Sequence, residues 1–397
     1  MSTSTKIKVL FVMNNLAVGG AEKSLISLLQ AFDYNRYEVD LLLFKQEGLF
    51  LSQVPAEVNL LPMPVNFKYF DMPFTKVVRD NWKPSRWNVI IQRIRFKLLR
   101  KKANNAAESE QLGWPAVSKT VPPLKKKYDV AIGYLQNTPN FYVIDKVISS
   151  KKFGFIHNDY VHLGMNKDLD YPYFKKFDKI ITVSEESKII LNTLFPHLKD
   201  KFIIIKNLIS ANSVRKLSQS EIVHLQKNSV ISVGRLTKQK NYYLSIAAFK
   251  ILYDKGIDFT WYILGAGDQE KDLKKTVKEI GFLEQVKFLG VKKNPYPYMK
   301  SADIFLLTSE FEGDGIVVTE SKILNKAIIL TNFSTAQSHI ENGENGFIVE
   351  MSSESVARML EKLITNESLR RKVADRLSQD NFGNEEEILK LYEQIGN

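Results

Sequence analysis

The 397-residue chain contains no cysteine, only five histidines, and no apolar run near the roughly 20 residues of a membrane-spanning helix. Without cysteine there are no disulfides and no thiolate metal sites, which fits a reducing compartment. The sequence also lacks the H-E-x-x-H pattern of zinc peptidases, the G-x-S-x-G turn of serine hydrolases and the Walker lysine motif. These absences argue against the common hydrolase classes.

The start of the sequence, Met1 to Met13, has a short apolar stretch but no pattern of a cleaved signal peptide. We therefore expect a cytoplasmic protein that is soluble or attached peripherally to the inner face of the cell membrane.

Positive charge is abundant and concentrated in one part of the chain. The formal net charge is +12, and the stretch from Arg79 to Lys127 carries thirteen basic and three acidic residues. A local excess of this size predicts a surface for an anionic partner, which is a membrane or a nucleic acid. No zinc finger, RNA-recognition or helix-turn-helix pattern accompanies it, so we expect no nucleic acid partner.

The centre of this basic stretch, Lys83 to Lys102, has the spacing of an amphipathic helix. Its apolar residues fall on one face and its basic residues on the others, and this arrangement suits the interface of an anionic membrane. The alternative is an ordinary helix packed against a core with a charged outer face. The residues that we assign to membrane or acceptor binding are Trp87, Ile91, Arg93, Lys97, Arg100 and Lys101, with Ile90, Ile94 and Leu98 on the same apolar face.

Short apolar runs alternate with helical patterns along most of the chain, which predicts an α/β protein with doubly wound parallel sheets. The expected strands are 7–13, 38–44, 129–133, 152–156, 179–183 and 202–205 in the first series, and 230–234, 260–265, 286–289, 303–307, 327–331 and 346–349 in the second. We predict a domain over residues 1–207, another over 208–380, and a final helical segment, 381–397. The least regular part is 66–124.

Two glutamates, Glu312 and Glu320, follow the predicted strand 303–307 across a glycine-flanked turn. In open α/β sheets ligands bind beyond the carboxyl ends of the strands, and the start of the following helix suits a phosphate. We expect Glu312 in the turn and Glu320 about two turns into the helix, with both carboxylates accepting hydrogen bonds from sugar hydroxyls. The alternative is that both are solvated surface residues.

Two glycine-containing turns end neighbouring strands of the second series. Gly234 is followed by Arg235 and Lys240, which suit a diphosphate because one offers a guanidinium fork and the other a point charge. The second turn, Gly265-Ala266-Gly267, lacks the third glycine of a dinucleotide fingerprint, because position 270 is Glu. A basic surface loop and an ordinary tight turn are the alternatives.

The first series carries three further candidates. Gly19 and Gly20 allow a close approach of backbone to a ligand, or form a simple turn. His157 lies at the end of a predicted strand, where it is either a ligand contact or a structural residue. Asp168-Leu169-Asp170 is a D-x-D triplet in an expected loop without companions for a metal site, so we predict no metal.

Together these motifs make the chain resemble the retaining glycosyltransferases of family 4, which have the GT-B fold and assemble bacterial surface polysaccharides and glycolipids. The resemblance covers nearly the whole chain and is most specific in the second domain. It implies two Rossmann-like domains facing across a cleft, the first binding the acceptor and the second binding a nucleoside-diphosphate sugar as donor (UDP by default). It also implies a C-terminal helix, 381–397, that crosses back to the first domain, and neither cofactor nor bound metal. The implied acceptor is a saccharide linked to a polyprenyl-diphosphate type of lipid.

The resemblance also assigns roles to residues. Arg235 and Lys240 neutralise the donor diphosphate, Glu320 binds the ribose, Glu312 holds the transferred sugar, and His157 contacts that sugar. The implied catalytic set is Arg235, Lys240, Glu312 and His157. The base is expected near Gly265–Gly267 and the stretch 288–290. The remaining donor-binding positions are Gly19, Gly20, Gly234, Gly265, Gly267, Leu289, Gly313, Asp314, Gly315 and Ile316.

Some positions depart from the family pattern. Asp314 stands where a bulky apolar residue or proline is common, and Asn325-Lys326-Ala327 replaces the usual Gly-x-Pro. These departures bear on the donor sugar rather than on the fold. Two alternatives remain at this point: a nucleotide-dependent oxidoreductase, and an inactive protein on the same fold that binds membranes or nucleic acids.

Overall fold

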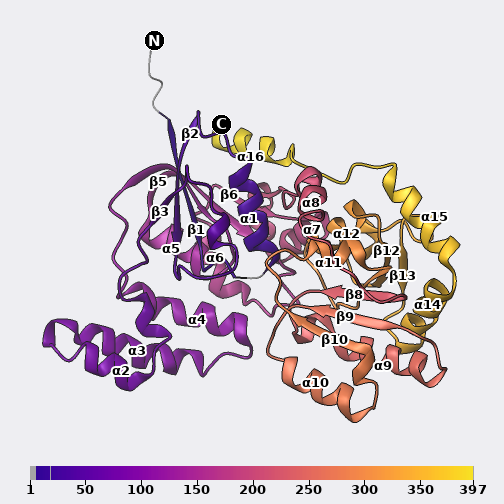
Figure 1. The fold of residues 1–397 in the computed structure, drawn as a ribbon. Coiled ribbons are helices and arrows are strands. Elements are labelled where there is room, and N and C mark those ends of the chain that lie inside the picture. Colours follow the sequence, from indigo (N-terminus) through magenta and orange to yellow (C-terminus); the bar gives the residue numbers. More distant parts are fainter. Residues whose placement is uncertain (1–5, 18, 397) are drawn as a thin grey trace. The chain divides into compact units, whose positions relative to one another are not determined.

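The computed structural model describes residues 6–17 and 19–396; residues 1–5, 18 and 397, including the first part of the N-terminal stretch considered above, lie outside this description. Contacts between residues divide the chain into two compact units (Figure 1). Unit 1 contains 6–17, 21–207 and 386–396, and unit 2 contains 19–20 and 208–385. The chain therefore passes from one unit to the other between Asn207 and Leu208, and it returns to unit 1 at Glu386.

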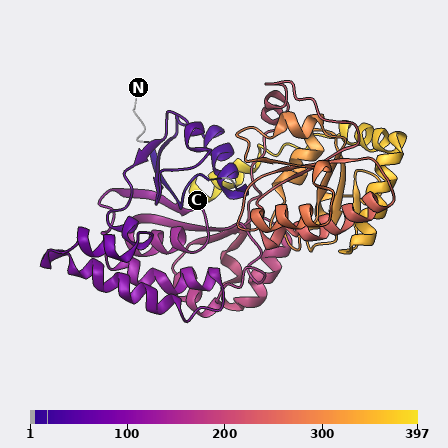
Figure 2. The same ribbon diagram turned by 60° about the horizontal axis from the view of Figure 1, so that its bottom comes forward.

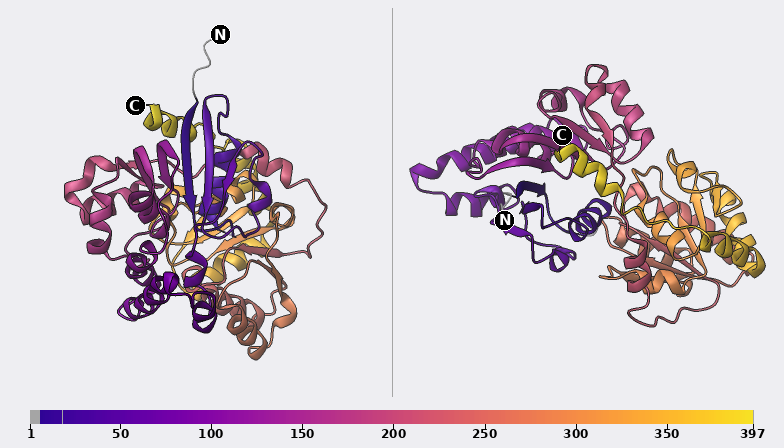
Figure 3. Two further views of the ribbon diagram at one scale, coloured as in Figure 1. Left: turned by 90° about the vertical axis from the view of Figure 1, so that its left-hand side faces the viewer. Right: turned by 90° about the horizontal axis from the view of Figure 1, so that it is seen from above.

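Unit 1 contains a parallel sheet of seven strands among the described residues, in the order β3-β2-β1-β4-β5-β6-β7 (Figure 3, left). Helices cover a parallel sheet on both faces, so its strands must be apolar on both faces. The apolar runs of these strands meet that requirement. The order reverses between β1 and β4, which is the switch point where ligands bind in such sheets. The strands are β1 (Ile7–Met13), β2 (Tyr37–Leu43), β3 (Asn59–Leu61), β4 (Lys127–Gly133), β5 (Ile148–Ile156), β6 (Lys179–Thr182) and β7 (Phe202–Ile204).

The helices of unit 1 include an insertion between β3 and β4, which Figure 2 shows as purple helices along one edge of the unit. The sequence predicted little regular structure here outside one helix. Asn105 is the N-cap of the last helix of the insertion, because its side chain accepts a hydrogen bond from the Glu108 N–H. The helices are α1 (Gly20–Gln30), α2 (Phe74–Asp80), α3 (Trp87–Arg100), α4 (Ala106–Ser118), α5 (Thr138–Lys146), α6 (Lys167–Phe174) and α7 (Glu185–Leu194), with 3-10 turns η1 (Leu51–Gln53), η2 (Phe67–Phe70), η3 (Pro84–Arg86) and η4 (Pro196–Lys201).

The last helix of the chain, α16 (Glu387–Gly396), is part of unit 1 and lies beside its first strands and helix (Figure 1). The ring of Tyr392 stacks on Tyr37 with 5.0 Å between centroids, and it meets Phe32 edge-on at 5.4 Å. Its hydroxyl oxygen accepts a hydrogen bond of 2.7 Å from the Asp33 N–H. These contacts complete a layer of unit 1 with residues from the far end of the sequence.

Unit 2 is built on a parallel sheet of six strands among the described residues, in the order β10-β9-β8-β11-β12-β13. Its switch point lies between β8 and β11. Arg235 and Lys240 follow the first of these strands, and Glu312 follows the second. The strands are β8 (Ser229–Val233), β9 (Thr260–Leu264), β10 (Val286–Gly290), β11 (Ile304–Leu307), β12 (Ala327–Thr331) and β13 (Phe347–Val349).

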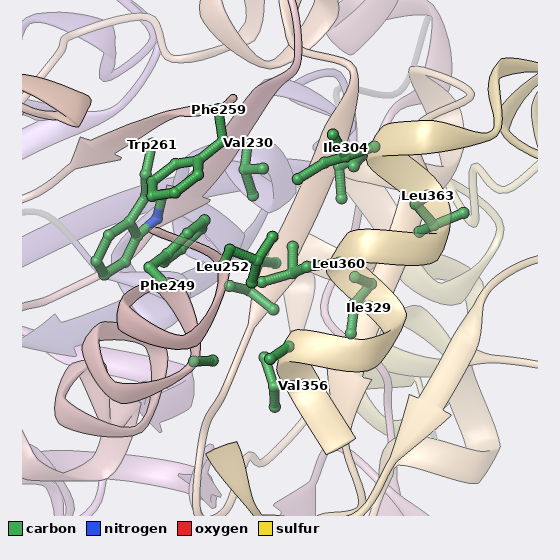
Figure 4. Close-up of a cluster of buried hydrophobic side chains, with 14 of the residues drawn as sticks. Val230, Phe249, Leu252, Phe259, Trp261, Ile304, Ile329, Val356, Leu360 and Leu363 are labelled. Carbon is green, nitrogen blue, oxygen red and sulfur yellow. The ribbon is translucent and has the colours of Figure 1, made fainter. Parts of the chain in front are cut away.

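The core of unit 2 packs helices against this sheet (Figure 4). The ring centroid of Phe249 lies 4.8 Å from that of Phe259 and 4.6 Å from that of Trp261. Leu360 and Leu363 of α14 cover the neighbouring strands. The helices are α8 (Ala211–Leu217), α9 (Tyr242–Asp254), α10 (Glu270–Glu279), α11 (Tyr296–Ser301), α12 (Ile316–Ile323), α13 (Ala336–His339), α14 (Ser353–Thr365) and α15 (Glu367–Ser378), with 3-10 turns η5 (Lys238–Lys240) and η6 (Leu283–Gln285).

Candidate active site

Three loops meet at the carboxyl edge of the unit 2 sheet, after β8, β9 and β10. The Leu236 N–H donates to the Ala266 carbonyl at 3.0 Å, and the Gly265 N–H donates to the Gly290 carbonyl at 2.9 Å. A Cβ at Gly265 would lie 1.9 Å from the Gly234 oxygen, and one at Gly267 would lie 2.2 Å from the Leu236 oxygen. Both glycines are therefore required for the loops to pack. The predicted contact of this turn with a base stays a prediction.

Lys240 and Glu312 form an ion pair at the mouth of these loops. The Lys240 Nζ donates to Glu312 Oε1 at 2.5 Å, and the two side chains are only 13% and 9% exposed. Ser309 Oγ also donates to Glu312 Oε1 at 2.5 Å. A carboxylate this buried is stable because it has a cationic and a neutral donor. The sequence predicted both charged residues but not Ser309, whose role depends on the turn.

The loops that carry this pair are joined by hydrogen bonds between backbone and side chains. Gln239 donates from its side chain to the Phe311 carbonyl at 2.9 Å, while its own carbonyl accepts from the Glu310 N–H at 2.8 Å. Thr308 Oγ1 lies 3.1 Å from the carbonyl oxygens of Lys240 and Asn241. The lysine and the glutamate are therefore held by a connected framework rather than by mobile loops.

Arg235 and Gly234 complete the loop after β8. Arg235 is exposed and has no ion pair with any other described residue. A Cβ at Gly234 would lie 3.2 Å from Lys240 Cε, so the glycine leaves room for the lysine chain. The site therefore contains one cation that is already paired and another whose charge is available to an anion.

Glu320 is the fifth residue of α12, so it lies in the second turn rather than two full turns into the helix. It is 3% exposed, and its Oε1 accepts a hydrogen bond of 3.1 Å from the Tyr296 hydroxyl. Burial, together with the charge of Glu320, raises the pKa of Tyr296 well above its usual value, so the phenol stays a donor. Tyr296 belongs to α11 and has no signal in the sequence that would link it to Glu320.

The turn between β11 and α12 provides a helix start suited to an anion. Gly315 precedes the helix with φ +55°, and a Cβ there would lie 2.9 Å from His339 Nε2. Only glycine adopts this conformation at little cost. Gly313 and Ile316 are buried beside it, and Asp314 is half-buried. The helix begins between Glu312 and Glu320 in the sequence, and the N-terminus of a helix favours an anion.

The candidates of unit 1 are placed as follows. Gly20 is the first residue of α1, and Gly19 precedes it. His157 directly follows β5, is 5% exposed, and its Nδ1 lies 3.0 Å from Asn207 Oδ1. Burial lowers the pKa of His157 to about 4, so the ring is neutral at pH 7. A neutral ring that donates through Nδ1 keeps Nε2 as an acceptor for a hydroxyl.

The D-x-D triplet is not in a loop, so that expectation was wrong. Asp168 and Asp170 lie in the first turn of α6, where acidic side chains complement the helix dipole. Tyr160 donates a hydrogen bond of 2.5 Å to Asp170, and burial raises the pKa of Asp170 to about 6. Within residues 6–17 and 19–396 no group of three or more acidic or histidine side chains is arranged to hold a metal ion.

The basic helix α3 presents two different faces. Trp87, Ile91, Ile94 and Leu98 are 46–58% exposed, and the exposed side chains of Arg95, Lys97 and Lys101 flank them. Arg93 and Arg100 point the other way: Arg93 donates to the Tyr69 carbonyl at 3.1 Å, and Arg100 donates to Ser109 Oγ at 2.6 Å. Of the six residues predicted for membrane or acceptor binding, four therefore belong to the exposed face. Among the described residues no helix is long and apolar enough to cross a bilayer.

Solved structures match this architecture over essentially its full length. HepE of Anabaena, in complex with UDP and glucose, has a TM-score of 0.68 at 18% identity and covers 99% of this chain and 100% of its own. TarM has a TM-score of 0.68 at 13% identity, with full coverage of both chains. The protein is therefore an α/β protein of the GT-B fold class, with two Rossmann-like parallel-sheet units.

Sequence comparison gives the class of relatives. Residues 214–379 match the family model described as "Glycosyl transferases group 1", so most of unit 2 carries this family's pattern. An N-acetylgalactosaminyltransferase of Campylobacter jejuni, named for the acceptor N-acetylgalactosamine-N,N'-diacetylbacillosaminyl-diphospho-undecaprenol, is 31% identical over 52% of this chain and 56% of its own length. The capsular polysaccharide biosynthesis glycosyltransferase CapM of Staphylococcus aureus is 31% identical over 48% and 53%. The chain spans about half the length of the curated relatives it matches.

Proposed function

We propose that this chain is a retaining glycosyltransferase that moves a hexose-type sugar from a nucleoside-diphosphate donor, UDP by default, to a lipid-linked saccharide in cell-surface polysaccharide biosynthesis. The observation that carries the proposal is the set of charged residues that follow the two strands at the switch point of unit 2. Arg235 and Lys240 come after β8, Glu312 and Glu320 come after β11, and Lys240 is paired with Glu312. The match of residues 214–379 to a glycosyltransferase family supports it, as do structural neighbours that bind UDP.

The chemistry asked of these residues is binding, orientation and stabilisation of charge. As the bond between the sugar and the diphosphate breaks, negative charge develops on the departing phosphate. Arg235 and Lys240 stabilise that charge together with the N–H groups at the start of α12. Glu312 accepts hydrogen bonds from hydroxyls of the transferred sugar, and the acceptor hydroxyl attacks from the face that the diphosphate leaves. We expect neither a covalent sugar–protein intermediate nor a required metal ion.

Glu320 is assigned to the ribose. Its carboxylate is buried and accepts a hydrogen bond from Tyr296, and a carboxylate suits the two ribose hydroxyls because it only accepts hydrogen bonds and each of its oxygens can accept more than one. Tyr296 then acts as a positioning residue, because it orients the carboxylate without touching the donor.

The exposed face of α3 supports attachment to an anionic membrane from the cytoplasmic side. Four large apolar side chains with cations on both flanks match a helix that lies in the membrane interface. The relative that acts on a diphospho-undecaprenol acceptor supports a lipid-linked substrate for this chain. Capsule, exopolysaccharide or O-antigen assembly is the pathway class we propose.

The first test is thermal stabilisation of the purified protein by UDP, GDP, ADP and NAD. A ligand at about 100 times its Kd adds about 2.7 kcal/mol to the folded state, which raises Tm by several degrees for a unit of this size. We expect a shift with one nucleoside diphosphate and its loss in Glu320→Gln, with Glu344→Gln, an exposed glutamate of the same unit, as the matched control.

Two results contradict the proposal. A shift with NAD alone favours an oxidoreductase. No shift with any nucleotide, together with binding to anionic vesicles that is indifferent to Glu320→Gln, favours an inactive binding protein on the same fold.

A further inference from the structure

Asn207 is a buried polar residue for which none of the motifs above gives a role. It lies three residues beyond the end of β7 and is the last residue of unit 1 before the chain passes to unit 2. Its side chain is buried, although asparagine is mostly found at protein surfaces. The fold brings it to His157, which directly follows β5 and precedes Asn207 by 50 residues in the sequence. A buried amide beside a buried imidazole calls for an explanation.

The ring of His157 is held in one orientation by its neighbours in unit 1. It stacks on Phe155 with 5.3 Å between centroids and 12° between planes, and the ring of Tyr134 lies 4.9 Å away. Tyr134 is itself anchored, because its hydroxyl oxygen lies 2.9 Å from Ser24 Oγ. The backbone N–H of His157 donates to the Gln136 side chain at 3.3 Å. These contacts fix where each ring nitrogen points.

The contact with Asn207 decides which ring nitrogen carries the proton. Nδ1 of His157 lies 3.0 Å from Oδ1 of Asn207. A carboxamide oxygen has only lone pairs, so Nδ1 is the donor in this hydrogen bond. A neutral imidazole has one N–H, and burial keeps this ring neutral at pH 7 by lowering its pKa to about 4. The remaining nitrogen, Nε2, is therefore a hydrogen-bond acceptor.

Nε2 of His157 is an acceptor that has no donor in the protein. It is buried, and it has no hydrogen-bond partner within residues 6–17 and 19–396. Most buried polar atoms in proteins are paired, because the loss of water without a new hydrogen bond is costly. An unpaired nitrogen of this kind is expected where a ligand supplies the missing donor.

The polarity of Nε2 limits the ligand group that it can meet. A hydroxyl donates a hydrogen bond through its hydrogen, whereas an ionised phosphate oxygen only accepts. Two acceptors that face each other repel, so this nitrogen is unsuited to the diphosphate of a nucleotide. It matches a sugar hydroxyl instead.

We infer that Asn207 is a positioning residue: it keeps the proton of His157 on Nδ1, so that Nε2 accepts a hydrogen bond from a hydroxyl of the transferred sugar. The inference rests on the proposed function for the ligand, and it adds the residue that sets the polarity of the contact. Asn207 acts through His157 and touches no substrate in this role. Without the Asn207 oxygen the proton is free to move to Nε2, where it turns the acceptor into a donor.

The first test determines the tautomer directly. The chain has only five histidines, so NMR of protein labelled with 15N-histidine gives few signals, and His157→Gln identifies those of His157. At pH 7 we expect a protonated Nδ1 and an unprotonated Nε2 in the unaltered protein. In Asn207→Leu, which is close to asparagine in size but has no acceptor, we expect the proton on Nε2 in at least half of the molecules.

Two further variants separate the tautomer from a general effect on the fold. Asn207→Asp retains an acceptor, so Nδ1 should stay protonated. Asn212→Leu, at an exposed position of α8, is the matched control and should leave the His157 signals unchanged. A proton on Nε2 in the unaltered protein, or one that stays on Nδ1 in Asn207→Leu, refutes the role of Asn207. The measurement on the unaltered protein decides the matter even where Asn207→Leu does not fold.

The second test determines what Nε2 meets. UDP, UDP-glucose and UDP-N-acetylglucosamine are added in turn to the labelled protein. Accepting a hydrogen bond moves the resonance of an unprotonated ring nitrogen towards that of a protonated one. We expect this movement with at least one sugar nucleotide and none with UDP alone. In Asn207→Leu the affinity for that sugar nucleotide, measured by calorimetry, should fall at least fivefold while the affinity for UDP stays within twofold.

The outcomes distinguish this inference from the proposed function. Movement of the Nε2 resonance to the same extent with UDP alone refutes the contact with a sugar hydroxyl. So does the absence of movement with a sugar nucleotide that binds. If no nucleotide binds at all, the proposed function fails, whereas the tautomer of His157 still decides whether Asn207 positions the ring.

Discussion

At the residue scale, the two cations that follow β8 differ in whether a carboxylate already neutralises their charge. Lys240 is paired with a buried glutamate, whereas Arg235 is exposed and has no ion pair with another described residue. Removing Lys240 leaves a buried carboxylate without its cation, which destabilises proteins by roughly 3–5 kcal/mol. Arg235 is therefore the residue whose loss separates activity from stability.

We predict that Arg235→Ala lowers kcat by roughly 10²–10³-fold, because one donor to the departing diphosphate is lost. Stability should change by no more than about 0.5 kcal/mol, as for other exposed positions. Steady-state kinetics and urea unfolding measure the two quantities.

The control for this prediction is Lys238→Ala, an exposed lysine of η5 two residues before Lys240. It should leave turnover within about twofold. Equal losses in both variants would mean that the loop contributes only its general positive charge.

His157 gives a prediction about pH. Its pKa is about 4 in the folded protein and about 6.5 when exposed, so the unfolded chain takes up the proton first as the pH falls. The stability it contributes is complete above about pH 6.5 and is lost as the pH drops towards 4. A difference of this size corresponds to about 3 kcal/mol. The difference in unfolding free energy between the unaltered protein and His157→Gln should shrink over this window in urea titrations.

The comparison with a variant is needed because Asp170 works in the opposite direction. Burial raises its pKa to about 6, so the folded protein gains a proton there as the pH falls and is relatively stabilised. His224→Gln, at an exposed position, is the control for replacing an imidazole and should change the unfolding free energy at pH 7 by no more than about 0.5 kcal/mol. A His157→Gln profile parallel to that of the unaltered protein would contradict the assigned burial.

The charged residues of the unit 2 loops could be proposed from the sequence because each lies in a segment that follows an apolar strand, and their roles stay a prediction. Glu312 and Lys240 were found in this way, without knowledge that they pair. Ser309 and Tyr296 were missed because their roles arise from contacts between segments, and a serine in a turn or a tyrosine among prolines is common in any surface loop.

At the scale of elements, runs of buried apolar residues made most strands recognisable to within one to four residues. The exception was β3, which has three residues, begins with an exposed Asn59 and lies at the edge of its sheet. The inserted helices α2 and α4 were also missed. One is short, and the other contains Gly113 and Pro115, which hide its periodicity.

The helix α3 carries the prediction for the membrane. A double variant, Ile91→Ser with Leu98→Ser, removes two exposed apolar side chains, each worth about 1.5–3 kcal/mol when buried. We expect binding to vesicles of phosphatidylcholine with phosphatidylglycerol to weaken at least tenfold in cosedimentation, because the basic flanks alone keep only a salt-sensitive attraction.

The matched control is Ile222→Ser, an isoleucine that is 86% exposed in unit 2. It should leave vesicle binding unchanged. Weakening to the same degree at both sites would assign membrane binding to general hydrophobicity instead of α3.

At the scale of the whole molecule, unit 1 depends on the end of the chain. We predict that Tyr392→Ala lowers the unfolding free energy by about 2–4 kcal/mol, because the ring stacks on Tyr37 and meets Phe32 in a mixed aromatic cluster. Tyr392→Phe, which loses only the hydrogen bond from Asp33, should cost about 1 kcal/mol. Thermal and urea unfolding followed by fluorescence provide the measurement.

A loss below about 0.5 kcal/mol in Tyr392→Ala would mean that α16 contributes little to unit 1. The relation of the two units, including the expected cleft, stays a prediction, since each unit is defined here by its own internal contacts.

The place of α16 also has a consequence for synthesis on the ribosome. Domains generally fold as units, the N-terminal one first, while the chain is still being made. Here the rings of Phe32 and Tyr37 stay uncovered until Tyr392 has been synthesised, so unit 1 begins to emerge first but acquires its last contacts at the end of synthesis. A chain whose synthesis stops within unit 2 lacks α16, so apolar surface of unit 1 remains exposed. We expect such truncated chains to be degraded by proteases faster than the full chain.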